Sequence, residues 1–254
     1  MELDDKVAIL TGGASGLGRS TVERFVKAGA RVAIFDLNEE LGEALAGELG
    51  EQAIFCSVNV GDDEVITAGI EKVMQTFGAI HVCVNCAGRG GGATKTLGRS
   101  GRFPIELFRD VININLVGTF NVMAQAAEKI SLNEPGEGGE RGVIINTASI
   151  AAYEGQKGQV AYAASKGGII SLTLPVARDL AYYGIRVVTI APGLFETPIL
   201  KGISDEAKES LAKSIPNPSR LGDVEEFSAL AEHIVNNRYI NGETIRLDAG
   251  LRMS

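Results

Sequence analysis

The sequence is poor in the residues from which metal sites and disulfide frameworks are built. It contains three cysteines and two histidines among 254 residues. Three cysteines in apolar surroundings do not fit the disulfide framework of a secreted protein and favour a reducing compartment. Cys83 and Cys86 form a CxxC pair, but a second such pair is lacking. We therefore interpret these thiols as packing residues and predict no metal site.

The chain also lacks long apolar runs, a basic leader and an excess of positive charge. No apolar run reaches the ~18 residues that would cross a bilayer, so we predict a soluble protein without a membrane span. The first residues, MELDDKVAIL, carry acids where a targeting peptide carries basic residues, which predicts a cytoplasmic location. A net charge of −8 argues against a nucleic-acid-binding surface.

What is present is a regular alternation of buried-strand and helix patterns. Because the chain has no internal repeat and no long linker, we predict a single domain over residues 1–254. The pattern predicts an α/β Rossmann fold with a doubly wound, seven-stranded parallel sheet and helices on both faces. The strands are expected near residues 7–11, 31–36, 53–59, 80–85, 142–148, 185–191 and 243–247.

The first motif, KVAILTGGASGLGRS, is typical of a buried strand, a glycine loop and the start of a helix. Gly12, Gly16 and Gly18 leave the backbone free of side chains, so amides can approach a pyrophosphate closely. A helix beginning near Leu17 would add its positive N-terminal end. A plain tight turn is the structural alternative.

A second motif lies at the end of the next predicted strand, RVAIF, where Asp36 stands 20 residues beyond Gly16. An acid at this place holds the ribose hydroxyls of NAD and repels the 2′-phosphate of NADP. Neither Ser15 nor Leu37 offers a cation to such a phosphate, so we predict NAD as the cofactor. The alternative is that Asp36 caps the following helix, NEELGEAL.

The third motif is YAASK, in which Tyr162 and Lys166 are four residues apart. In a helix they share a face, and the ammonium group of Lys166 would favour the phenolate of Tyr162. Ser149, at the end of the apolar run VIINTAS, would hydrogen-bond the same reacting oxygen. These three residues predict proton exchange with an alcohol or carbonyl. An exposed Tyr–Lys pair is the structural alternative.

These motifs, together with NCAG, NINLVGTFN and PGLFET, resemble the short-chain dehydrogenase/reductase family over essentially the whole chain. The resemblance implies that Ser149, Tyr162 and Lys166 are catalytic. It also implies that Asn115 holds a water linking Lys166 to solvent, although a helix kink or a satisfied core residue is the alternative for Asn115. The cofactor contacts that it implies are Gly12, Ser15, Gly16, Leu17, Gly18, Asp36, Asn59, Val60, Asn85, Ala87, Gly88, Tyr162, Lys166, Pro192, Gly193 and Thr197.

Further stretches, among them RGVIINTAS, NPSRLGD and NGETIRLDAGLRM, resemble the type 2 3-hydroxyacyl-CoA dehydrogenase branch of this family, also known as type 10 17β-hydroxysteroid dehydrogenase. This resemblance implies NAD-dependent interconversion of short or branched 3-hydroxyacyl-CoA and 3-ketoacyl-CoA in fatty-acid or branched-chain amino-acid breakdown. The alternatives are a hydroxysteroid or other secondary-alcohol dehydrogenase, and an NAD-binding scaffold or regulatory subunit. Asp36 disfavours an NADPH-dependent reductase of fatty-acid synthesis.

Three segments are expected to govern substrate choice or assembly. The loop 89–102 carries Arg89, Lys95, Arg99 and Arg102 and is interpreted either as a cover for the coenzyme A tail or as a solvated loop. The insertion 133–141 is taken as structural. Residues 194–220, with Pro198, are expected to form a substrate lid. The resemblance also implies a homotetramer built from helix faces in 103–130 and 151–182 and from the C-terminal segment.

Overall fold

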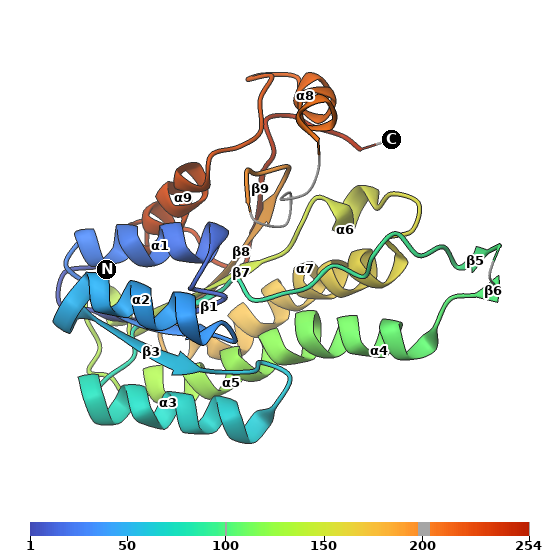
Figure 1. Ribbon diagram of the computed structural model, residues 1–254. Coiled ribbons are helices and arrows are strands. Elements are labelled where there is room, and N and C mark those ends of the chain that lie inside the picture. Colours follow the sequence, from blue (N-terminus) through green and yellow to red (C-terminus); the bar gives the residue numbers. More distant parts are fainter. Residues whose placement is uncertain (100, 198–203, 254) are drawn as a thin grey trace.

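The computed structural model describes residues 1–99, 101–197 and 204–253. A parallel, seven-stranded sheet with the order β3-β2-β1-β4-β7-β8-β9 forms its centre (Figure 1). The prediction of a doubly wound sheet is thereby confirmed, and the order reverses between β1 and β4. The strands are β1 Val7–Thr11, β2 Arg31–Asp36, β3 Ala53–Ser57, β4 Val82–Asn85, β7 Gly142–Thr147, β8 Ile185–Pro192 and β9 Thr244–Leu247.

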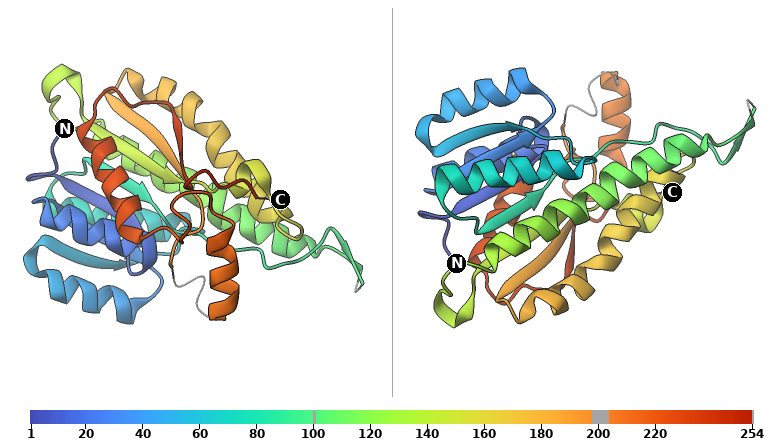
Figure 2. Two further views of the ribbon diagram at one scale, coloured as in Figure 1. Left: turned by 90° about the horizontal axis from the view of Figure 1, so that it is seen from above. Right: turned by 90° about the horizontal axis from the view of Figure 1, so that it is seen from below.

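Helices cover both faces of this sheet, as Figure 2 shows from opposite sides. Alternate residues of β1 explain this layering, because Ala8 and Leu10 belong to one apolar core and Val7 and Ile9 to the other. Helices α1, α2 and α9 pack on the first core and α3, α5 and α7 on the second. The helices are α1 Gly16–Lys27, α2 Glu39–Leu49, α3 Asp63–Phe77, α4 Ile105–Ile112, α5 Thr119–Ile130, α6 Ala151–Glu154, α7 Val160–Ala181, α8 Asp205–Lys213 and α9 Val224–Asn236.

Helix α7 is long and apolar enough to cross a membrane by length and composition alone, and 33% of its most apolar window is buried. Core helices share these properties, so one such helix is weak support for a membrane span. In the structure α7 packs beside β8 and α6 and carries both residues of the YxxxK motif. One face of α7 therefore belongs to the core.

The structure departs from the predicted pattern in two places. Strand β3 ends at Ser57, so Asn59 and Val60 lie in the following loop and not at the end of the strand. The expected loop 89–102 contains a short antiparallel hairpin, β5 Leu97–Gly98 paired with β6 Gly101–Arg102. Figures 1 and 2 show this hairpin at the tip of an arm that extends away from the sheet. Two-residue strands among glycines leave no apolar alternation from which to predict them.

The insertion 133–141 has the structural role that was expected of it. The carboxylate of Glu140 is buried and pairs with Arg186 on β8, with 2.8 Å between Oε1 and Nε. The same guanidinium donates to the carbonyl oxygens of Ile234, Val235 and Ile240. The insertion thus ties β8 to the C-terminal end of α9 through a satisfied buried charge pair.

Candidate active site

The predicted motifs meet at one edge of the sheet. The glycine loop follows β1, Asp36 ends β2, the NCAG turn follows β4, Ser149 follows β7 and Pro192 ends β8. Because parallel strands have their carboxyl ends at the same edge, these segments lie side by side at the point where the strand order reverses. The residues of the predicted site therefore lie at the edge of the sheet where they were expected.

The glycine loop has the geometry of an anion cradle. Gly12 has a φ of +64°, and a methyl group in its place would lie 2.8 Å from the backbone nitrogen of Ala87. A methyl group on Gly18 would overlap the carbonyl of Gly12. Helix α1 begins at Gly16, and Ser15 makes no side-chain cap. The first turn of α1 contains no acid, unlike those of α2, α3 and α9, so its amides suit a pyrophosphate.

Asp36 is held beside this loop. Its Oδ2 accepts a hydrogen bond from the amide of Ala14, and its Oδ1 accepts one from that of Asn38, both at 3.0 Å. The cap of α2 is Asn38, whose side chain accepts from Leu41. The alternative that Asp36 caps this helix is therefore wrong. Leu37 is 66% exposed, so an apolar side chain stands where a cation would be needed for a 2′-phosphate.

Asn59 and Val60, which were expected to contact the adenine, both contact other residues of the protein. Asn59 is exposed, and its Oδ1 accepts from the amide of Gly61 at 3.0 Å. Val60 is buried, and its carbonyl lies against Gly118. A contact of Asn59 and Val60 with adenine stays a prediction.

Buried polar side chains hold the NCAG turn in place. Asn85 is 2% exposed and donates to Oδ1 of Asn146 at 2.9 Å. Thr11 donates to Oδ1 of Asn85, and its hydroxyl accepts from the amide of Ala87 at 3.1 Å. We therefore assign Asn85 to the support of the turn, while Ala87 and Gly88 present the backbone that was expected to contact the cofactor.

Tyr162, Lys166 and Ser149 come together as predicted. Tyr162 and Lys166 lie one turn apart on α7, and Nζ of Lys166 is 5.9 Å from the centre of the tyrosine ring. The Lys166 ammonium is buried and donates to the carbonyl of Thr147 at 2.7 Å. Ser149 lies close enough to the phenol of Tyr162 to lower its pKa, and the Ser149 hydroxyl accepts from the amide of Ala151 at 3.1 Å.

Burial is the main influence on the electrostatics of this trio. Burial raises the pKa of Tyr162, and the hydrogen bond from Ser149 offsets part of this rise. Burial also lowers the pKa of Lys166 to about 8, so the amine is mostly protonated at neutral pH. Burial outweighs the other influences on the pKa of Tyr162, with the Lys166 ammonium beside the ring, and the predicted lowering by Lys166 stays a prediction.

Asn115 is a satisfied core residue in a π-helical turn, Asn113–Gly118, between α4 and α5. Its Oδ1 accepts from the amide of Arg89 at 2.8 Å, and its Nδ2 donates to the carbonyl of Arg89 and to the hydroxyl of Ser165. The alternative of a satisfied core residue is therefore observed, within a π-helical turn. A water relay from Asn115 to Lys166 stays a prediction.

The two cysteines of the CxxC pair behave as packing residues. Burial raises the pKa of Cys83 to about 12 and that of Cys86 to about 11. The hydroxyl of Thr147 donates to Sγ of Cys86 at 3.5 Å. Such pKa values oppose the thiolate that redox chemistry or metal binding requires.

The PGLFET segment joins the site to the expected lid. The carbonyl of Pro192 accepts from the amide of Ile150 at 3.1 Å, and the amide of Gly193 donates to Leu247 at 2.9 Å. Thr197 is half-buried, and Pro198 lies outside the described residues. The amphipathic stretch of the lid forms α8, for which Ser204 provides the cap.

The basic residues of segment 89–102 divide into two sets. Arg89 is paired with Asp110 on α4 and so is committed to the body of the protein. Lys95, Arg99 and Arg102 are exposed on the hairpin arm. The choice between a coenzyme A cover and a solvated loop therefore concerns three cations and not four.

Sequence reasoning missed the groups that hold the predicted catalytic residues. Thr147 supplies the carbonyl that binds Lys166, and Thr11 orients the NCAG turn. Both are the last residues of strands that lead into a motif, and this position is a usable signal. No local signal identifies the pairing of Glu154 with Arg246, which are 92 residues apart.

Comparisons with known proteins agree with this geometry. Residues 6–208 match the short chain dehydrogenase family. The 3-hydroxyacyl-CoA dehydrogenase type-2 of Bos taurus is 50% identical over 248 residues, which are 97% of this chain and 95% of that protein.

Two solved structures are also similar. The 3-hydroxyacyl-CoA dehydrogenase type-2 of Mycobacterium avium has a TM-score of 0.94 and 45% identity, covering 98% of this chain and 96% of that one. The 3-ketoacyl-(acyl-carrier-protein) reductase of Brucella melitensis, complexed with NADH, has a TM-score of 0.87 and 30% identity, covering 99% and 100%. With its catalytic trio assembled at the expected edge, the chain belongs to the short-chain dehydrogenase/reductase family of oxidoreductases.

Proposed function

We propose that this protein is an NAD-dependent dehydrogenase that interconverts 3-hydroxyacyl-CoA and 3-ketoacyl-CoA. The observation that carries the proposal is the convergence of Ser149, Tyr162 and Lys166 beside a glycine loop and Asp36. The relatives at 45–50% identity that are named 3-hydroxyacyl-CoA dehydrogenases support the substrate class. Breakdown of fatty acids or branched-chain amino acids is the role that we infer from this chemistry.

The residues of the glycine loop fit NAD. The uncapped N-terminus of α1 would hold the pyrophosphate, and Asp36 would accept hydrogen bonds from the ribose hydroxyls. Its negative charge opposes the 2′-phosphate of NADP. Bound NAD⁺ supplies the acceptor for the hydride that leaves the substrate carbon.

The protein's own residues move the proton. In oxidation, Ser149 and Tyr162 would hydrogen-bond the alcohol oxygen, and the phenolate of Tyr162 would take its proton. In reduction, the neutral phenol would return the proton to the carbonyl oxygen. The hydrogen bond from Ser149 favours the phenolate, whereas burial favours the phenol. Tyr162 is therefore better prepared as an acid than as a base at neutral pH.

The coenzyme A moiety gives the substrate negative charge that the exposed cations of the hairpin arm complement. Lys95, Arg99 and Arg102 have no ion-pair partner among the residues that the structure describes. We infer that they attract the phosphates of coenzyme A. Their contribution is expected to fall with added salt, because exposed charges are screened.

The proposal is tested by offering the purified protein NADH or NADPH with acetoacetyl-CoA, with a β-keto ester lacking coenzyme A, and with a ketosteroid. Rapid NADH oxidation with the thioester, and little with the ester or the steroid, supports it. Better turnover of the steroid or the ester would favour a general secondary-alcohol dehydrogenase. NADH binding without any turnover would favour a scaffold.

We also propose a homotetramer. Its support is a set of exposed apolar side chains on the helices that were predicted to form subunit contacts, namely Ile105, Val117, Phe120, Val160 and Leu174. Apolar groups of this size gathered on neighbouring helices are a common feature of subunit contacts. Sedimentation of the wild type and of a Phe120→Asp variant tests this: a tetramer that dissociates in the variant supports it, and a monomeric wild type contradicts it.

We propose a cytoplasmic location, because all three cysteines are free thiols in the structure and two are fully or nearly fully buried. Fractionation of the source cells with an antibody against the protein tests this. Recovery in a membrane or extracellular fraction would contradict it.

A further inference from the structure

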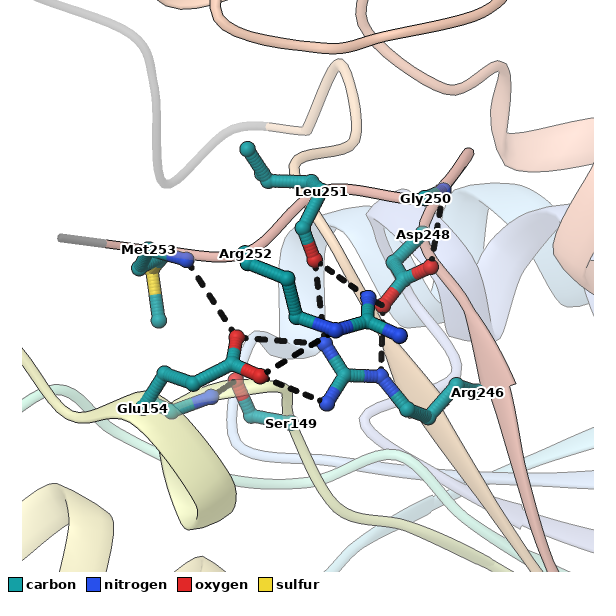
Figure 3. A network of polar contacts seen from close by, with 9 residues as sticks. Ser149, Glu154, Arg246, Asp248, Gly250, Leu251, Arg252 and Met253 are labelled. Atoms are coloured by element: carbon teal, nitrogen blue, oxygen red, sulfur yellow. Dashed lines mark hydrogen bonds and ion pairs between the residues drawn. The ribbon is translucent and has the colours of Figure 1, made fainter.

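The short helix that follows Ser149 ends in an ion pair with a distant strand. Glu154, the last residue of α6, accepts two hydrogen bonds from Arg246 on β9, at 2.8 and 3.1 Å (Figure 3). The geometry is bidentate, with both carboxylate oxygens engaged by the two terminal guanidinium nitrogens. Such fork-to-fork pairs fix orientation as well as distance.

The guanidinium of Arg246 is anchored on all sides. Its Nε donates to Asp248 at 2.7 Å, and Nη2 donates to the carbonyl of Leu251 at 3.0 Å. The ring of Tyr153 lies beside it, with 4.9 Å between ring centre and Cζ. Figure 3 shows Glu154 at the end of the guanidinium and Asp248 above it. Because Arg246 is held by these contacts, it fixes the position of Glu154.

The C-terminal tail closes the network. The amide of Met253 donates to Oε2 of Glu154 at 3.2 Å, and Arg252 lies 3.2 Å from Asp248 and 3.5 Å from Glu154. Glu154 thus receives hydrogen bonds from both β9 and the tail. The hydrogen bond from Arg246 lowers the pKa of Glu154, so the carboxylate stays charged throughout the neutral range.

Glu154 is coupled to Ser149 through a single turn. The hydroxyl of Ser149 accepts from the amide of Ala151 at 3.1 Å, and its carbonyl accepts from Ala152 at 3.0 Å. The amide of Glu154 donates to the carbonyl of Ile150, also at 3.0 Å. Because a helix of four residues is not stable on its own, the position of this turn depends on contacts such as those of Glu154.

The same network reaches the lid. Ile150, next to Ser149, is 2% exposed and clusters with Leu251 of the tail and Ile215, each 3% exposed. Leu194 and Leu221, at the two ends of the lid, pack against this cluster. The tail that contacts Arg246 and Glu154 therefore also packs against Ile150 and the base of the lid.

We propose that Glu154 and Arg246 are positioning residues of the active site, which hold the Ser149 turn and the base of the lid in catalytic register. The inference rests on the proposed function, because it concerns the reaction that Ser149 serves. Neither side chain contacts the reacting atoms. Their effect is indirect, since a displaced Ser149 would no longer hydrogen-bond the phenol of Tyr162 or the substrate oxygen.

The test compares Glu154→Gln with Glu232→Gln. Glu232 pairs with Arg24 at 3.0 Å and is 29% exposed, against 22% for Glu154, and its pair lies between α1 and α9, away from Ser149. For Glu154→Gln we expect kcat to fall by roughly 10-fold to 100-fold with the Kd for NADH unchanged. Glu232→Gln is expected to keep the wild-type kcat. Arg246→Lys should retain more activity than Arg246→Met, because it keeps the charge.

A second measurement does not depend on turnover. The Ser149 hydrogen bond lowers the pKa of Tyr162, so Glu154→Gln should raise that pKa toward its value in Ser149→Ala. NMR of ring-labelled tyrosine, assigned with Tyr162→Phe, measures it. An unchanged pKa together with an unchanged kcat, or an equal loss of kcat in Glu232→Gln, would overturn the inference. If the wild type turns over no substrate, the proposed function fails, and the tyrosine pKa alone decides whether Glu154 positions Ser149.

Discussion

The two halves of the active site are held in different ways. On the cofactor side, backbone contacts dominate: Asp36 accepts from the amide of Ala14, and Gly12 lies against the backbone of Ala87. On the substrate side, the turn that carries Ser149 ends in a side-chain ion pair between Glu154 and Arg246, which are 92 residues apart. The cofactor side is therefore held mainly by the backbone, whereas the Ser149 turn is held by charged side chains.

The largest effect is expected from Tyr162→Phe, which should greatly reduce catalysis on the substrate side and leave cofactor binding intact. Without the phenolic proton, kcat should fall by roughly a hundred-fold to ten-thousand-fold, because the acid–base group is lost. The Kd for NADH should change little, since the glycine loop and Asp36 are untouched. Steady-state kinetics and NADH fluorescence titration measure the two quantities. Retention of turnover would show that another group transfers the proton.

The next effect concerns stability alone. Glu140→Gln removes the carboxylate from the buried pair with Arg186, whose side chain is 8% exposed. We expect a loss of about 3 kcal/mol in the free energy of unfolding, because the guanidinium keeps only its carbonyl partners. Urea unfolding measures the loss, and kcat of the folded variant should equal that of the wild type. A loss of kcat without a loss of stability would place the insertion in the catalytic half.

The preference for NADH over NADPH tests the role of Asp36. Asp36→Asn removes the charge and keeps one of the two oxygens that accept from the amides of Ala14 and Asn38. The Kd for NADPH should therefore tighten about ten-fold relative to that for NADH, which corresponds to ~1.4 kcal/mol. Fluorescence titration with both cofactors measures this ratio. Leu37→Asn leaves the charge in place and serves as the control, and an equal change in both variants would argue against Asp36 as the selector.

The smallest effect is a pH dependence at the far end of the sheet. Nδ1 of His81 accepts from the amide of Val7 at 3.1 Å, and burial, aided by Lys6 and Arg31, lowers its pKa to about 4. An unfolded histidine titrates near ~6.5, so the contribution of His81 is complete above that pH and is lost as the pH falls toward 4. Because His81 is partly exposed, we expect roughly 1 kcal/mol. Urea unfolding at both ends of this range, compared with His81→Gln, measures it; equal pH slopes in the two proteins would contradict this assignment.

The sequence was sufficient for those parts of the molecule whose signals are local. The seven strands, the glycine loop, Asp36 and the Tyr162–Lys166 spacing were predicted, because periodicity and glycine placement act within a few residues. The meeting of Ser149 with Tyr162 followed from strand order. These features needed no knowledge of side-chain packing.

The remainder depends on tertiary contacts. The raised pKa of Tyr162 results from burial, which residue spacing alone does not report. The β5–β6 hairpin consists of two-residue strands without periodicity. The partners of Glu154 come from β9 and the tail, and no short-range pattern connects them.

The most direct test of the account is the rate of NADH oxidation by the purified wild-type protein with acetoacetyl-CoA, compared with the rate with NADPH. We predict rapid turnover with NADH and little with NADPH. Asp36 selects the cofactor, and Ser149, Tyr162 and Lys166 act on the substrate bound beside it. Equal rates with the two cofactors would contradict the role of Asp36. No turnover despite measurable NADH binding would contradict the proposed dehydrogenase activity itself.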